Sequence, residues 1–172
     1  MPEHLTINDK QYRLGSFQNE ISFFGGSSGT VTKEHLTDSI SQSDIPANVG
    51  YAYIGRGVTS IGSMTEAFGD GVFQGDNLES VTIADSVTTI GAYAFYENDL
   101  TQSLIIPNSV IEIGDEAFFN NKLTDVFISD SVTEIGDWAF SGNNNRIEKV
   151  KLSKNLISIS DNLFAGNTDP TL

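Results

Sequence analysis

Cysteine is missing altogether from this chain of 172 residues. Its absence excludes disulfides, thiolate metal sites and a cysteine nucleophile, and leaves the redox compartment open. Histidine is nearly missing too, because the chain has only His4 and His35, and both precede the region that repeats. A Ser-His-Asp arrangement would need one of them beside a serine of the repeats, and no spacing suggests this. The sequence therefore favours a protein that is not an enzyme.

Long hydrophobic runs are also missing. No stretch reaches the roughly 18 apolar residues of a transmembrane helix, so no membrane insertion is expected. Residues 1–9 lack a basic region followed by an apolar stretch, and so this chain shows no signal peptide.

Basic side chains are scarce: 9 Lys and Arg stand against 23 Asp and Glu, for a formal net charge of −14. Phosphate binding needs clustered Lys and Arg, so nucleic acid is not an expected partner. Residues 58–172 carry 17 acidic and five basic side chains, and hold most of the net charge. Solubility of an elongated surface is one explanation of this charge, and attraction of a cation or a basic partner is the other.

A repeated motif is the main feature that is present. Ser109-Val110-x-x-Ile113-Gly114-x-x-Ala117-Phe118 returns 22 residues later, between Ser131 and Phe140. Such self-similarity indicates stacked supersecondary units. Five units share a Val/Leu-x-x-Ile pair and a closing phenylalanine, which we expect to be buried on a short helical turn. The pairs are Val58/Ile61, Val87/Ile90, Val110/Ile113, Val132/Ile135 and Leu156/Ile159, and the phenylalanines are Phe73, Phe95, Phe118, Phe140 and Phe164.

A short strand precedes each Val/Leu-x-x-Ile pair. Val126 and Ile128 are two residues apart and therefore point to the same side of a strand. Copies one repeat apart must lie parallel, so each unit is predicted to add one strand to a continuous parallel sheet. The last strand carries Lys149 and Lys151, which predict an edge protected against pairing and a monomeric protein. The other inward pairs are Ala52/Ile54, Val81/Ile83, Leu104/Ile106 and Val150/Leu152.

A polar residue stands three positions after each closing phenylalanine. Stacked amide side chains there can bond the backbone of the adjacent coil. The alternative is a row of calcium ligands with nearby Asp99, Asp115 and Asp137, but one acid per coil fits calcium less well. The polar residues are Asp76, Asn98, Asn121, Asn143 and Asn167.

Residues 1–47 do not carry the repeat. Residues 5–7 and 11–14 flank a turn and predict a hairpin, and residues 32–40 predict a short helix. We therefore expect an N-terminal cap over residues 1–47 and a solenoid of about five units over residues 48–172.

The repeat resembles the BspA-type leucine-rich repeat, whose pattern is L-x-x-V-x-I-P-x-S-V-x-x-I-G-x-x-A-F-x-x-N. The best single copy runs from Ser103 to Phe118, and the match covers about residues 50–167. The resemblance implies an α/β repeat solenoid, a right-handed coil with a concave parallel β-sheet and short helical turns on the convex side. It also implies binding, as in bacterial surface proteins and adhesins, a surface or secreted location, and no cofactor. The last unit departs from the pattern with Ser160 for Gly and Leu163 for Ala.

Outward strand residues are the predicted binding site. Ile105 and Phe127 form an apolar centre there, and an exposed apolar patch is typical of a binding surface. The alternative is simple β-propensity. The column is Tyr53, Thr82, Ile105, Phe127 and Lys151. Ser103 and Asp125 are placed one residue earlier, on the opposite side of the pleat.

These features predict a non-catalytic module, similar to an adhesin, that binds a protein or glycan at a cell surface through the concave sheet. The second hypothesis is a structural or scaffold domain that assembles larger proteins through its ends. Trp138, on the closing turn, is a further candidate for a binding position.

Overall fold

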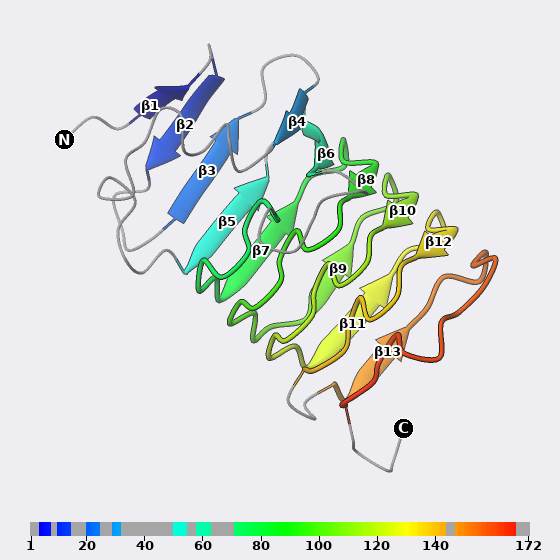
Figure 1. Cartoon of the computed structure of the whole chain (residues 1–172). Helices are drawn as coiled ribbons and strands as arrows, with labels where there is room; N and C mark the ends of the chain where they lie inside the picture. Colours follow the sequence, from blue (N-terminus) through cyan, green and yellow to red (C-terminus); the bar gives the residue numbers. More distant parts are fainter. Residues whose placement is uncertain are drawn as a thin grey trace.

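The computed structural model describes residues 4–7, 10–14, 20–24, 29–31, 50–54, 58–62, 71–143 and 147–167. The chain winds into a stack of coils whose strands stand in two rows (Figure 1). The long-strand row contains β1 (His4–Ile7), β2 (Lys10–Leu14), β3 (Glu20–Phe24), β5 (Tyr51–Ile54), β7 (Ser80–Ile83), β9 (Leu104–Ile106), β11 (Asp125–Ile128) and β13 (Lys149–Lys151). The short-strand row contains β4 (Gly29–Val31), β6 (Val58–Ile61), β8 (Thr89–Ile90), β10 (Glu112–Ile113) and β12 (Glu134–Ile135).

Each of the middle coils therefore contributes two strands, where the sequence predicted one. The short strands lie within the Val-x-x-Ile segments, whose spacing of three between buried residues hides the period of two that marks a strand. The residues between Val and Ile bond to the neighbouring coils: the Ile111 amide donates to the Thr88 carbonyl at 2.8 Å, and the Thr133 amide to the Ile111 carbonyl at 2.9 Å.

The short-strand row is one parallel sheet in the order β12-β10-β8-β6-β4, whereas the long-strand row divides between β7 and β9 into sheets of five and three strands. Both rows continue into the segment predicted as a cap, because β3 pairs parallel with β5 and β4 pairs parallel with β6. Before them, β1 and β2 form an antiparallel hairpin. The helix predicted over residues 32–40 lies outside the described residues.

The third side of each coil is a turn, and the described residues contain no helix, so the predicted helical turns are not observed. The backbone explains why, because Tyr93, Glu116 and Trp138 have φ angles of 55°, 54° and 61°. A right-handed helix needs φ near −60°, so a left-handed residue two positions before the closing phenylalanine interrupts it. The turns bond to the next coil instead, as where the Phe118 amide donates to the Ala139 carbonyl at 2.8 Å.

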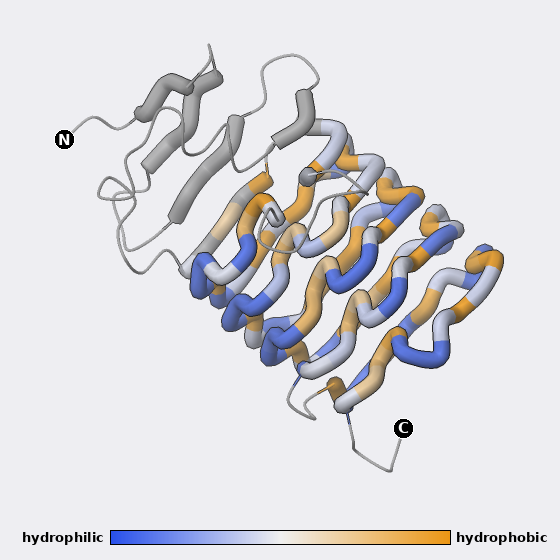
Figure 2. The backbone as a smooth tube through the Cα atoms, in the orientation of Figure 1, coloured by the Kyte–Doolittle hydropathy of each residue, from blue (hydrophilic) through white to orange (hydrophobic). Residues whose placement is uncertain are grey.

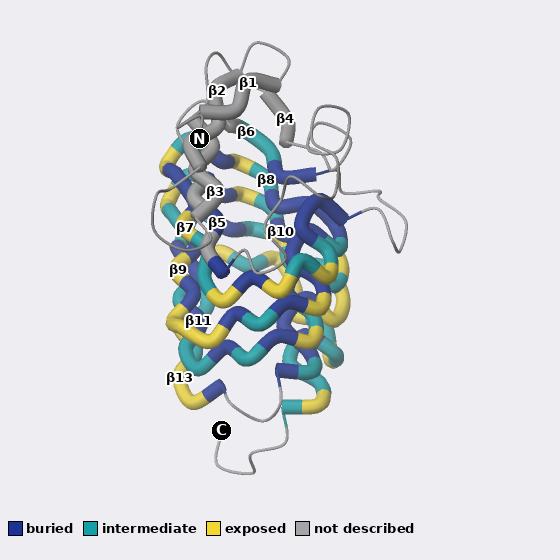
Figure 3. Tube along the Cα trace, turned by 90° about the vertical axis from the view of Figure 1, so that its left-hand side faces the viewer, coloured by how far each residue is buried: buried dark blue, intermediate teal, exposed yellow. Residues whose placement is uncertain are grey.

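The closing phenylalanines form the continuous centre of the core, as predicted. Successive rings from Phe73 to Phe140 lie 5.1 to 5.3 Å apart at their centroids, and the rings of Phe140 and Phe164 are 5.7 Å apart. Phe118 is fully buried. Apolar segments recur at equivalent places in successive coils (Figure 2), and buried segments alternate with exposed ones along each coil (Figure 3).

The predicted asparagine ladder is present. Asn121 is fully buried, accepts a hydrogen bond from the Leu100 amide (3.2 Å) and donates to the carbonyls of Phe95 (2.9 Å) and Phe118 (3.1 Å). Asn143 and Asn167 make equivalent bonds one and two coils later. The amides thus satisfy backbone groups that the turns leave unpaired.

Glycine follows the Ile of each Val-x-x-Ile pair and permits adjacent coils to come close together. A Cβ built on Gly136 would collide with the backbone nitrogen of Asp115 in the preceding coil. The last coil has Ser160 at this place, and its Ile159 is 57% exposed, whereas the equivalent Ile113 is fully buried. Ile159 therefore does not share the burial of its equivalents, and the last coil, which has a Cβ in place of the glycine, forms no short strand among its described residues.

The phenylalanine stack predicts unequal effects along the array. Phe118→Ala removes a fully buried ring with stacked neighbours on both sides and should lower the free energy of unfolding by about 3–5 kcal/mol. Phe164→Ala removes a half-buried ring with one stacked neighbour, so the loss should be smaller. Chemical denaturation measures both, and equal losses would contradict the stack as the centre of stability.

The asparagine ladder gives a second prediction. Asn121→Ala should cost at least about 1–3 kcal/mol, because it removes the side chain that bonds the Leu100 amide and the Phe95 carbonyl. Asn108→Ala is the matched control, since Asn108 is exposed and should change stability by less than about 0.5 kcal/mol. Urea unfolding of the two variants compares them directly, and indistinguishable midpoints would contradict a stabilising ladder.

Candidate binding face

The predicted column lies on the outside of the long-strand row, and we call this surface the long-strand face. Thr82 and Lys151 are exposed, Ile105 is 67% exposed and Phe127 is half-buried. Ile105, Phe127 and Lys151 occupy matched positions of β9, β11 and β13. Tyr53 is the backbone register partner of Thr82, and its side chain lies outside the described part of the structure.

A polar row borders this column. Ser103 Oγ lies 2.8 Å from Asp125 Oδ2, and Lys149 Nζ lies 4.0 Å from Asp125 Oδ1. Placing Ser103 and Asp125 on the opposite side of the pleat was wrong: they stand two residues before Ile105 and Phe127, and period-two alternation puts them on the same side. The long-strand face therefore has an apolar centre beside a hydrogen-bonded acid.

The carboxyl end of β9 opens into a hollow next to Ile105. Pro107, Asn108 and Ser109 line it, together with Asp85 from the preceding coil. Ser109 Oγ is buried and, among the described residues, has no hydrogen-bond partner. The hollow extends the long-strand face toward the corner of the coil and adds a carboxylate and a carboxamide to its margin.

The outside of the short-strand row also carries apolar side chains, which the sequence analysis missed. Ile111 is 47% exposed and Ile157 is 75% exposed, with Thr133 between them in the hydrogen-bonded column. Glu112 and Glu134 are direct register partners there. The signal was present in the sequence, because Ile111 and Ile157 each follow the first residue of a Val/Leu-x-x-Ile pair.

Trp138 lies on the turn side, where it is 40% exposed. The equivalent residues of the two coils before it are Glu116 and Tyr93, and the Tyr93 hydroxyl donates to Glu116 Oε1 at 3.4 Å. Partial burial, offset by the Tyr93 hydrogen bond and reinforced by Asp115, raises the pKa of the Glu116 carboxyl. This side combines aromatic and acidic groups.

Metal ligation and membrane crossing have no support among the described residues. No three His, Cys, Asp or Glu side chains gather there as a set of metal ligands. The same residues include no helix with the length and apolarity that a membrane crossing needs. What the long-strand face offers chemically is contact area and hydrogen bonding.

Comparison with known proteins identifies the repeat. The model of the BspA type leucine rich repeat region matches residues 66–170 with six copies. A leucine-rich repeat protein from Bacteroides ovatus superimposes with a TM-score of 0.58 at 24% identity, over 97% of this chain and 36% of that one. One from Eubacterium ventriosum has a TM-score of 0.58 at 21% identity, over 88% of this chain and 45% of that one.

These similarities show the fold, and the chain spans less than half the length of either structure. No match is found among curated proteins. Because the family model matches residues 66–170, more than half of the chain, the chain belongs to the BspA-type leucine-rich repeat family.

Proposed function

We propose that this chain is a non-catalytic binding module, of the kind found in adhesins, that recognises a protein or glycan at a cell surface through the long-strand face. The observation that carries the proposal is the exposure of Ile105, 67%, on the outward side of β9 in the long-strand row. A fixed apolar side chain loses little conformational entropy on binding, so the contact it makes is worth more. Membership of a repeat family whose proteins are generally binding modules supports the same function.

The surroundings of Ile105 fit a partner with both apolar and polar groups. Phe127 supplies an adjacent aromatic edge, and the Ser103–Asp125 pair supplies fixed hydrogen-bonding groups two residues away. Aromatic anchors beside polar groups are typical of the residues that dominate binding energy at interfaces. The acidic surface around them disfavours polyanionic partners.

A scaffold role is the second candidate, and one observation favours it. The last coil leaves Ile157 and Ile159 exposed at 75% and 57%, which provides apolar area at an end of the stack. Assembly through this end would leave the long-strand face free. The two functions therefore predict that substitutions at different residues weaken partner binding.

Substitution at matched exposed isoleucines separates the two functions. The intact chain is immobilised and tested against surface-protein extracts and a glycan array, and the same is done for Ile105→Asp and Ile157→Asp. The proposed function predicts that Ile105→Asp weakens capture by more than about 1 kcal/mol, or about fivefold in Kd, while Ile157→Asp does not. Loss with Ile157→Asp alone would instead support assembly through the end of the stack.

Thermal unfolding of the same variants provides the control for folding. Both isoleucines are mostly exposed, so each variant should keep a melting temperature close to that of the parent. Phe127→Ala removes a half-buried ring and should cost less stability than Phe118→Ala. Unchanged binding by both Ile105→Asp and Phe127→Ala would overturn the long-strand face as the binding site.

A further inference from the structure

We propose that the outer edge of β13 is a docking strand for an extended segment of a partner protein in which acidic and apolar residues alternate. The proposal does not depend on the long-strand face. β13 pairs with β11 along one edge, and no described strand pairs with its other edge. Addition of a strand to such an edge is a recurring mode of peptide recognition, because the free backbone groups supply hydrogen bonds.

The apolar floor beside this edge is only partly covered. Val150 and Leu152 are half-buried, whereas Val126 and Ile128, at the same places one coil earlier, are fully buried. Val126 and Ile128 are more buried because β13 lies beside β11, and a further strand beside β13 would bury Val150 and Leu152 in the same way. Inward apolar side chains of an added strand would bury this surface, as β13 itself buries the side chains of β11.

The positive charge beside the outer edge of β13 favours an acidic partner segment. Residues 147–154 carry three lysines and one acid, whereas residues 71–143 carry twelve acids and one lysine. Lys149 and Lys151 are exposed, and Lys151 makes no ion pair with the described residues. A basic edge on an otherwise acidic array favours acidic residues on the outward side of the incoming strand.

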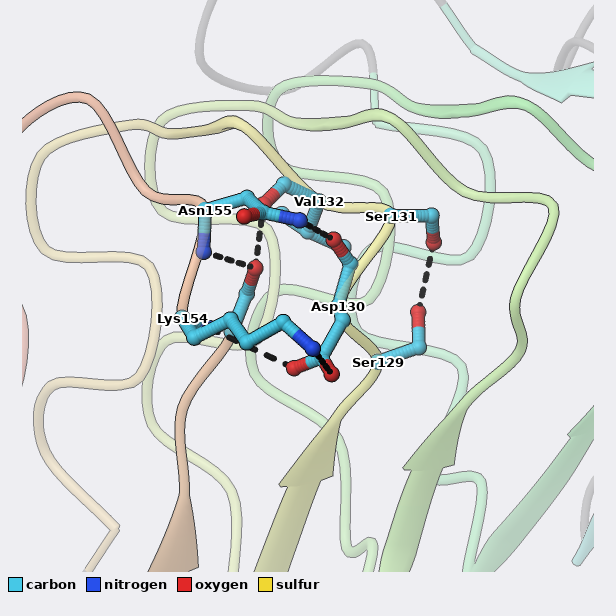
Figure 4. A network of polar contacts seen from close by, with 7 residues as sticks. Ser129, Asp130, Ser131, Val132, Lys154 and Asn155 are labelled. Atoms are coloured by element: carbon cyan, nitrogen blue, oxygen red, sulfur yellow. Dashed lines mark hydrogen bonds and ion pairs between the residues drawn. The ribbon is translucent and has the colours of Figure 1, made fainter.

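The third lysine has another role. Lys154 Nζ lies 2.8 Å from Asp130 Oδ2, and Asn155 Nδ2 donates to the Asp130 carbonyl at 2.7 Å (Figure 4). Ser153 Oγ donates to the Val132 carbonyl at 2.6 Å in the same network. These contacts hold the corner of the last coil against the coil before it, so the position of β13 is fixed before any partner arrives.

The pairing of β11 with β13 is the pattern for the incoming strand. Asp125 stands opposite Lys149 and Val126 opposite Val150. A parallel strand with an acid opposite Lys149 and an apolar residue opposite Val150 repeats these two pairs on the outer edge of β13. A second acid opposite Lys151 would stand where β11 has Phe127. A second copy of β13 would instead bring lysines against lysines, and like charges directly opposite destabilise a pair of strands. The same lysines therefore exclude self-pairing and accept an acidic segment.

The test uses the full chain and two synthetic peptides. The acidic peptide is Leu-Thr-Asp-Val-Glu-Ile-Ser, and the matched control replaces Asp and Glu with Lys. In ¹⁵N–¹H correlation spectra, the acidic peptide should shift the amides of Val150 and Lys151 in a saturable way, and the control peptide should bind at least about tenfold more weakly, since two opposite-charge pairs become like-charge pairs.

Charge reversal on the protein completes the test. Lys149→Glu combined with Lys151→Glu should reverse the preference, so that the lysine peptide binds better than the acidic one. Lys122→Glu is the matched control, because it changes a lysine away from β13 and should leave the preference unchanged.

Three results would overturn the proposal: shifts confined to other strands, equal binding of the two peptides, or a preference that survives the charge reversal. Concentration-dependent shifts at β13 without peptide would assign the edge to a second copy of the chain, and would overturn it too.

Discussion

The spacing between coils is the constraint on which the rest of this structure depends. Parallel strands hydrogen-bond at about 4.8 Å, and every other part of a coil must repeat close to that distance. The phenylalanine rings meet it at 5.1 to 5.3 Å over four coils, which is also the distance at which flat rings are in contact. The asparagine amides span it with bonds to the coil before, and the glycines remove the one side-chain atom that would prevent it. The repeated phenylalanine, asparagine and glycine are therefore explained by one distance.

The same constraint explains why the last coil differs. Ser160 restores a Cβ where the spacing requires glycine, and the coil no longer forms a short strand. The ring distance rises to 5.7 Å at Phe164, and Ile159 becomes 57% exposed. Polar contacts also attach the last coil, because the Lys154 ammonium pairs with the Asp130 carboxylate of the coil before. The side-chain hydrogen bond from Lys154 lowers the pKa of the Asp130 carboxyl. The last coil is thus attached through the long-strand row, the corner and the turn side, where the Phe140 amide donates to the Leu163 carbonyl at 3.0 Å, and it adds no strand to the short-strand row.

Sequence periodicity predicted the features that the spacing dictates and missed those set by backbone conformation. The phenylalanine stack, the asparagine ladder and the inward pairs such as Val126/Ile128 follow from residue identity at a fixed period. The short strands were missed because buried residues three apart do not show a period of two. The turns were taken as helical because the Ala-Phe pair suits a helix, whereas the left-handed φ angles of Tyr93 and Glu116 leave no trace in residue type. The exposure of Ile105 followed from alternation, and its contribution to binding stays a prediction.

Function in such an array must depend on positions that the spacing leaves free. Inward positions repeat almost unchanged from coil to coil, since Val87, Val110 and Val132 occupy one site and are all fully buried. The outward positions of the long strands instead change from Thr82 to Ile105 to Phe127 to Lys151, although the backbone beneath them hardly changes. The fold does not require one particular residue at these outward positions. The change from polar to apolar to basic side chains is therefore not needed for stability and is available for binding. A partner that contacts this column across the strands would meet polar Thr82 first, the apolar pair Ile105 and Phe127 next and basic Lys151 last, so the binding surface has a direction.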